Sequence, residues 1–141
     1  MGEDGPIEAR LAALHAALAR AFAAHRPDIV AIEEVFHARN ARSAIVLGQA
    51  RGVALLAAAQ AGARVRSFAP AAIKQAVTGT GRAEKEQVGR MVCMLLGITI
   101  RDRVDATDAL AAAICGLLRV RDPAARPEAG GFVARAARGR R

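Results

Sequence analysis

The sequence lacks the features that define membrane, secreted and zinc-binding proteins. Its longest stretch without a charged residue, Gly52 to Ala63, is shorter than the ~20 residues that span a bilayer. No secretory signal opens the chain. Cys93 and Cys115 lie among apolar helical neighbours, with no C-x-x-C pair and no histidine at ligand spacing, which argues against a disulfide or a zinc site. We therefore expect a cytoplasmic protein with reduced thiols and no membrane partner.

Acidic residues are scarce relative to basic ones. The 141 residues contain 21 Lys and Arg against 13 Asp and Glu, a net charge of +8. This excess favours a polyanionic partner, and nucleic acid fits better than an acidic membrane surface. With 53% hydrophobic residues, the chain is long enough for one domain with a core. We place that domain at residues 1–120 and expect the arginine-rich segment 121–141, which has no periodicity, to be a basic disordered tail.

Hydrophobic periodicity predicts helices alternating with two short strands. After Gly5-Pro6, apolar residues recur every three or four positions up to Phe22, and Pro27 ends this first helix. The further predicted elements are a strand at 28–33, a helix at about 42–61, a strand at 64–68, a short helix from 70 that Gly79-Thr80-Gly81 interrupts, a helix at about 83–96 and a helix at about 105–118. This order indicates an α/β layer fold, whose first strand we expect to be buried on both sides, as in a parallel sheet.

Three carboxylates are candidate metal ligands. Glu33 ends the first predicted strand, and Asp105 and Asp108 open the last predicted helix. Such carboxylates could converge on Mg²⁺, which is the usual machinery for cutting phosphodiesters. An alternative is that Asp105 and Asp108 only cap their helix and offset its dipole. Glu34 points to the opposite face of the strand, where we expect an exposed acid.

Basic and aromatic residues add candidates for DNA binding. Lys74, Arg82 and Lys85 surround the glycine turn and a helix start, an arrangement that could hold phosphate, although neither a Walker A motif nor a G-x-G-x-x-G motif is present. Phe36 and Arg39 lie in the polar segment after the acidic strand. A base-stacking role for Phe36 is a reasonable alternative to a core role.

Five sequence blocks, in this order, resemble the RuvC family of bacterial Holliday-junction resolvases. The blocks are Ala31-Ile32-Glu33-Glu34-Val35-Phe36, Leu47-Gly48-Gln49-Ala50-Arg51-Gly52-Val53, Ile73-Lys74-Gln75-Ala76-Val77-Thr78-Gly79, Ala83-Glu84-Lys85-Glu86-Gln87-Val88 and Asp105-Ala106-Thr107-Asp108-Ala109-Leu110. The resemblance extends from about Ile7 to Leu118. Five blocks at sensible spacing are more specific than any one of them.

The resemblance implies a ribonuclease H-like fold and a homodimer that nicks two opposed strands of a four-way DNA junction. It implies two Mg²⁺ ions per site, with Mn²⁺ as a substitute, and branch-migration partners RuvA and RuvB. The family's acidic ligands fall on Glu33, Asp105 and Asp108. Its DNA-contacting lysines fall on Lys74 and Lys85, and its junction-probing aromatic falls on Phe36. The helix that contains Gly48 and Gly52 matches the one used for dimer contacts.

One departure from the family pattern is specific. Family members begin with a strand bearing Ile-Asp-Pro-Gly, whose aspartate is the first metal ligand, and this sequence has no such motif. We expect an N-terminally truncated ribonuclease H-like fold, with only the later strands and the helices present, that binds junctions and does not cut them alone. A fragment or a mis-assigned start is the favoured explanation. The alternative is a naturally shortened, non-catalytic module for DNA binding or dimerisation.

Overall fold

The computed structural model describes residues 5–34, 40–100 and 104–120 of the chain. Seven elements follow one another in this part. They are α1 (Ile7–His25), β1 (Ile29–Glu33), α2 (Ala41–Gln60), β2 (Arg64–Phe68), α3 (Pro70–Thr78), α4 (Lys85–Leu96) and α5 (Val104–Val120). The predicted α/β order is confirmed. The only shift of note is that α4 begins at Lys85, because Glu84 keeps an extended backbone and precedes the first helical residue.

Strands β1 and β2 form a two-stranded parallel sheet, with Ile29 opposite Arg64 and Glu33 opposite Phe68. Parallel strands end at the same edge, so Glu33 lies beside the point where β2 leads into α3. The expectation that β1 is buried on both sides is wrong: its first four residues are half-buried and Glu33 is exposed. The physical reason is coverage, since α5 is the one helix of the described part that packs extensively on β1.

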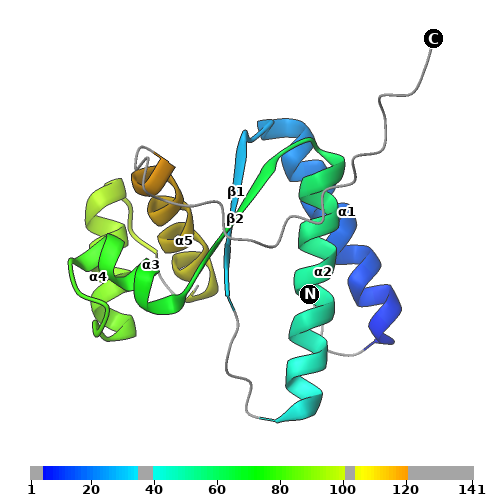
Figure 1. The fold of residues 1–141 in the computed structure, drawn as a ribbon, viewed down its shortest axis with the longest axis horizontal. Helices are drawn as coiled ribbons and strands as arrows, with labels where there is room; N and C mark the ends of the chain where they lie inside the picture. The colour runs from blue at the N-terminus through cyan, green and yellow to red at the C-terminus, as the bar shows by residue number, and fades with distance from the viewer. Residues whose placement is uncertain (1–4, 35–39, 101–103, 121–141) are drawn as a thin grey trace.

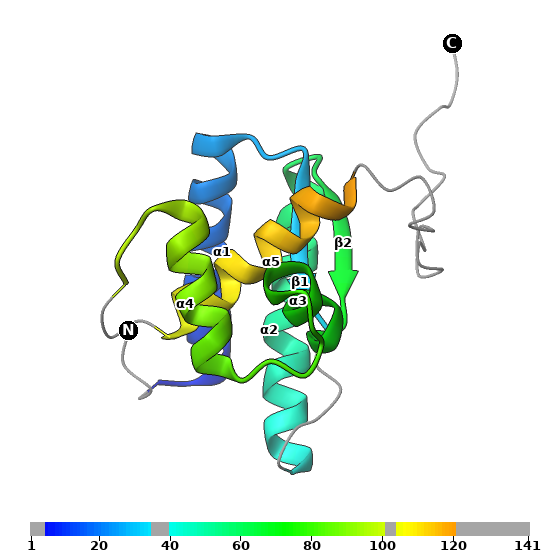
Figure 2. The same ribbon diagram turned by 90° about the vertical axis from the view of Figure 1, so that its left-hand side faces the viewer.

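The core lies on one side of the strands. Figures 1 and 2 show α3, α4 and α5 grouped there, with α1 and α2 on the other side. The buried cluster consists of Phe68, Ile73, Val77, Ala83, Val88, Val92, Ala111, Ala112 and Cys115. Gly116 lets α5 approach the sheet closely, because a Cβ at this position would lie 3.1 Å from the Cβ of Ala31. The core therefore fixes α5, which carries two of the candidate ligands, against β1.

Helices α1 and α2 pack on each other without forming a comparable core. None of the α1 residues is buried, and in α2 only Ala57 and Ala58 are. His15 Nε2 and Gln60 Oε1 are 2.7 Å apart and link the two helices. Several large apolar side chains of α2 remain exposed, namely Ile45, Leu47, Leu55 and Leu56. This side of the molecule thus has apolar surface that the described residues leave exposed.

Local signals in the sequence set the ends of the helices. The Asn40 side chain accepts a hydrogen bond from the Ser43 N–H at 2.9 Å and caps α2. Pro70 occupies the first turn of α3, where its missing N–H costs nothing. Gly79 ends α3 with φ of 82°, a conformation that other residues adopt at a cost, and its N–H donates to the Gln75 carbonyl. The chain then turns into α4 and brings Lys85 towards α5.

Helix α2 is long and apolar enough to cross a membrane by length and composition alone, and it is the one such helix in the part described. Its contacts favour another interpretation. Arg51, in the middle of α2, donates hydrogen bonds to the Glu33 carbonyl at 3.0 Å and to Ser67 Oγ at 2.8 Å. A helix tied to both strands through a charged side chain is part of a folded domain. Its exposed apolar residues are therefore a candidate association surface.

Candidate active site

Four charged side chains meet in a pocket at the carboxyl ends of the strands. Glu33 comes from β1, Lys74 from α3, Lys85 from α4 and Asp108 from α5, and the pocket has a volume of about 250 Å³. Pro70, Ile73, Val88 and Ala111 form its apolar lining. The carboxyl edge of an open α/β sheet is where such folds usually bind ligands. The structure therefore brings together four residues that are far apart in the sequence.

The pocket residues are positioned by the packing described above. Glu33 is the last residue of β1, and Arg51 holds its carbonyl oxygen. Asp108 lies three residues after Asp105 on α5, so both occupy the same face of that helix. Ile73 and Val88, next to Lys74 and near Lys85, are buried in the core. The lysines thus project from rigid helices, not from loops.

Lys85 and Asp108 form an ion pair, with Lys85 Nζ 2.8 Å from Asp108 Oδ2. The two side chains are 57% and 42% exposed, so solvent and ions can reach both. The hydrogen bond that Lys85 donates to Asp108 raises the pKa of Lys85, and the charges of Asp108, Asp105 and Glu33 add to this effect. Lys85 is therefore held firmly in its charged form beside the acidic residues.

Glu33 has a raised pKa. Partial burial is the largest cause, and the negative charge of Asp108 adds to it, while Lys85 and Lys74 act in the opposite direction. The influence of Asp108 shows that the two carboxylates lie within electrostatic reach of each other. Two carboxylates that repel each other in this way gain from a shared cation.

Two of the other predicted site residues, Asp105 and Arg82, do not line the pocket. Asp105 is exposed and does not line it, but its charge acts on Lys85. It lies in the first turn of α5, where an acid also favours the helix dipole, so the capping role stays open. Arg82 is exposed in the turn before α4, where its N–H contacts Thr80 Oγ1. Phe36 and Arg39 lie outside the described residues.

Glu34 differs from its prediction. It is half-buried, and its backbone N–H donates to the Phe68 carbonyl at 2.9 Å. The parallel pairing continues one hydrogen bond beyond Glu33, which draws Glu34 against the sheet. The expectation of an exposed acid at this position is therefore wrong.

Two features of the site were not predicted. One is the bridge from Arg51 to both strands, and the other is the pairing of Lys85 with Asp108. A signal for the first exists in the sequence, since Arg51 is the one charged residue between Ser43 and Gln60. The second had none, because residues 23 positions apart meet only through tertiary packing.

The two acidic residues of the pocket are suited to form part of the ligand set of a magnesium ion. Mg²⁺ in nucleic-acid enzymes is commonly held by one or two carboxylates together with phosphate oxygens and water. Glu33 and Asp108 supply such a pair. Across the ranges 5–34, 40–100 and 104–120, however, no group of three Asp, Glu, His or Cys side chains is close enough to hold a metal without further ligands.

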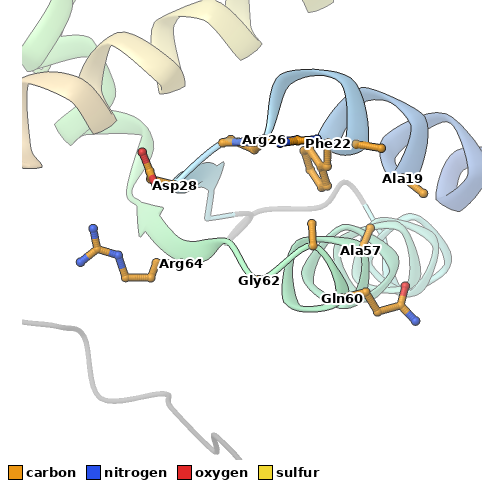
Figure 3. A pocket seen from close by; sticks show the side chains of 11 residues that line it. Ala19, Phe22, Arg26, Asp28, Ala57, Gln60, Gly62 and Arg64 are labelled. Carbon is orange, nitrogen blue, oxygen red and sulfur yellow. The ribbon is translucent and has the colours of Figure 1, made fainter.

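A larger hollow of about 850 Å³ lies at the opposite end of the strands, between α1 and α2. Phe22 projects from α1 towards α2, and Arg64 extends away from both helices (Figure 3). Among the described residues that line it, Asp28 is the only acidic one. It therefore lacks the paired carboxylates and lysines that give the smaller pocket its chemistry.

The fold and the smaller pocket define a class of protein: an α/β domain that presents carboxylates and lysines together at the carboxyl edge of a parallel sheet, as a metal-dependent phosphodiester-binding site requires. Comparison with known families identifies it further. Residues 1–116 match the family described as crossover junction endodeoxyribonuclease RuvC. The chain belongs to this RuvC family.

Curated relatives carry the same description. The chain is 54% identical over 114 residues to the crossover junction endodeoxyribonuclease RuvC of Myxococcus xanthus, a match that covers 79% of this chain and 60% of the relative. It is 50% identical over 113 residues to that of Alkalilimnicola ehrlichii, covering 80% of this chain and 68% of the relative. The match to the protein of Halorhodospira halophila, 54% identical, covers 75% and 64%. The chain thus spans about two thirds of the length of these relatives.

Solved structures agree with the predicted fold. The structure of Thermus thermophilus RuvC has a TM-score of 0.75 and 34% sequence identity, and the match covers 86% of this chain and 74% of that one. The structure of T. thermophilus RuvC in complex with Holliday junction substrate has a TM-score of 0.76 and 31% identity, covering 86% and 73%. The ribonuclease H-like arrangement of the helices and parallel strands is therefore confirmed.

Proposed function

We propose that this chain binds four-way DNA junctions and provides the Glu33 and Asp108 carboxylates for Mg²⁺-dependent, symmetric nicking of two opposed strands. The observation that carries the proposal is the pocket in which these carboxylates meet Lys74 and Lys85. Two comparisons support this proposal: the chain belongs to the RuvC family, and its fold is similar to that of a homologue solved with Holliday junction substrate. Recombination and repair of chromosomal DNA in the cytoplasm is the corresponding role, with RuvA and RuvB as partners by family resemblance.

Each residue of the pocket has a distinct task in this proposal. Glu33 and Asp108 would hold Mg²⁺, and Asp105, one turn before Asp108, would be a further ligand. The metal would supply activation of the attacking water and stabilisation of the leaving 3′-oxygen. Lys74 and Lys85 neutralise the phosphate, which makes that part of the affinity independent of sequence and sensitive to salt. Phe36, Arg39 and Arg82 are further proposed DNA contacts.

We further propose that nicking requires another carboxylate, carried by a strand along the free edge of β1. Within the described ranges β1 pairs with β2 alone, so its other edge is open to a further strand. The lack of a three-ligand cluster among the described residues supports the same view. The chain by itself should then bind junctions without cutting them, and a non-catalytic DNA-binding module remains the second candidate function.

A homodimer is the proposed assembly. Gly48 and Gly52 lie one turn apart on α2, and a Cβ at either position would meet nothing within 4 Å. Exposed Ile45, Leu55 and Leu56 on the same helix supply apolar surface. A self-complementary contact along α2 would relate two pockets by two-fold symmetry, as cutting two opposed strands requires.

The test is a nicking assay on a synthetic four-way junction with Mg²⁺ or Mn²⁺, paired with a binding assay over a range of salt concentrations. The chain alone should bind with a steep salt dependence and show no cleavage. A longer protein with an added carboxylate-bearing strand should cut symmetrically, and Asp108→Asn in it should reduce nicking by about 100-fold or more while binding persists. Equal loss of binding and cleavage would contradict the ligand role of Asp108. Robust cutting by the short chain would contradict the need for another carboxylate.

A further inference from the structure

The ion pair between Lys85 and Asp108 places a positive charge on a proposed metal ligand. Lys85 is the first residue of α4 and Asp108 is on the second turn of α5, so the pair joins two helices across the pocket. Its separation of 2.8 Å is that of a full hydrogen bond between charged groups. The ammonium therefore occupies Oδ2, one of the two Asp108 oxygens through which a metal could bind.

Lys85 is also the lysine whose charged form is stabilised by all three acidic residues of the site. Asp108, Asp105 and Glu33 all raise the pKa of Lys85, the first of them through a direct hydrogen bond. Lys74 lines the same pocket, but no ion pair to it is found within the described ranges. The two lysines therefore differ: Lys85 is bound to a carboxylate, and Lys74 is available to an incoming anion.

We propose that Lys85 is a resident counter-ion of Asp108 that a divalent metal displaces, so that metal binding releases the Lys85 ammonium towards a DNA phosphate. The inference rests on the proposed function and adds an order of events to it. Mg²⁺ requires its ligands at about 2.0–2.1 Å in a near-octahedral arrangement. An ammonium on Asp108 Oδ2 competes for the same lone pairs and repels the incoming dication. Metal and the Lys85 ion pair are thus alternatives at Asp108.

The exposure of the pair makes this exchange feasible. Both side chains are in contact with solvent, and partly exposed ion pairs are weak enough for a dication to break. After the exchange the pocket contains two unpaired lysines beside a bound metal. Metal and phosphate then bind with positive coupling, and by linkage each strengthens the other to the same extent.

The decisive measurement is metal affinity without DNA. Mn²⁺ is titrated into the full chain at constant ionic strength, and free Mn²⁺ is followed by its electron paramagnetic resonance signal. Lys85→Gln should bind Mn²⁺ about two- to five-fold more tightly than the wild type, because the competing ammonium is gone. Lys85→Arg should stay close to the wild type, because a guanidinium also pairs with carboxylate.

Matched variants separate the exchange from a general effect of charge. Lys74→Gln removes a charge from the same pocket without breaking the ion pair, and its gain in Mn²⁺ affinity should be clearly smaller. Arg90→Gln removes an exposed charge from the same helix as Lys85 and should leave the affinity unchanged. Thermal unfolding of each variant shows that the fold is intact.

The outcomes distinguish this inference from the proposed function. Unchanged or weaker Mn²⁺ binding by Lys85→Gln overturns the exchange, and so does an equal gain in Lys74→Gln. Asp108→Asn tests the metal site itself. If the wild type binds Mn²⁺ no better than Asp108→Asn, the metal site and the exchange both fail. If Asp108→Asn binds Mn²⁺ more weakly than the wild type, the metal site is supported. The result with Lys85→Gln then decides whether the exchange occurs.

Discussion

The two sides of the strand pair are stabilised in different ways. On one side, α3, α4 and α5 enclose a buried cluster that includes Val92 and Cys115 at 0% exposure. On the other side, α1 contains no buried residue and α2 contains two, both alanines. The side with the core carries all the pocket residues except Glu33, which ends β1. The contrast shows that the described residues bury the side that carries the pocket and leave apolar side chains of α2 exposed on the other side.

The largest expected effect tests the close contact between α5 and β1. Gly116→Leu would force a side chain into the space occupied by Ala31 and should lower the free energy of unfolding by about 3 kcal/mol. Chemical denaturation followed by circular dichroism measures the loss. Gly116→Ala should lower the free energy of unfolding less, because Ala31 then has to move by only a few tenths of an ångström. A fully stable Gly116→Leu variant would show that α5 is not fixed against the sheet.

Truncation of one apolar residue on each side compares the two packings directly. Val92→Ala removes a fully buried side chain and should cost about 2 kcal/mol. Leu14→Ala on α1 removes a half-buried one and should cost about 1 kcal/mol. Both values come from the same denaturation experiment. If Leu14→Ala cost as much as Val92→Ala, the contrast between the two sides would not hold.

The association surface is tested by Gly48→Leu. Open space surrounds this glycine, so the substitution should leave the free energy of unfolding of a single chain nearly unchanged. It should weaken a dimer formed along α2 by about tenfold or more, because a close helix approach is blocked. Sedimentation equilibrium gives the association constant. A wild-type chain that stays monomeric at high concentration would contradict the proposed dimer.

The smallest effect concerns the charge of Glu33. Its raised pKa means that the folded chain binds a proton more tightly than the unfolded chain does. The free energy of unfolding should therefore fall as the pH rises from about 4.5 through the folded pKa. Glu33→Gln should remove this decline and be slightly more stable than the wild type at neutral pH, with no difference at lower pH. Denaturation in metal-free buffer measures it, with Glu8→Gln on α1 as a control for net charge. A wild-type advantage at neutral pH would contradict the cause given for the shift.

Local signals made the elements of this fold predictable. Pro27, Pro70 and Gly79 mark the ends of elements, and β-branched residues mark the strands, so all seven elements lie where expected to within a few residues. The positions of Glu33 and Asp108 at a strand end and a helix start suggested that they could converge on a metal, and the likeness to a family made this expectation specific. The half-buried state of β1 and Glu34 was not, because it depends on how many helices cover the sheet. The roles of Phe36, Arg39 and the tail remain predictions.

Arg51 gives helix α2 a second role. The helix that presents Gly48 and Gly52 also holds the backbone of Glu33 and the hydroxyl of Ser67 through one guanidinium. If two copies join along α2 as proposed, the contact at Gly48 and Gly52 lies within a turn of Arg51, which holds the backbone of a proposed metal ligand. A change in the tilt of α2 would then reach Glu33 through the Arg51 guanidinium. In the proposed dimer, Arg51 would therefore link the contact between subunits to the metal-binding edge of each.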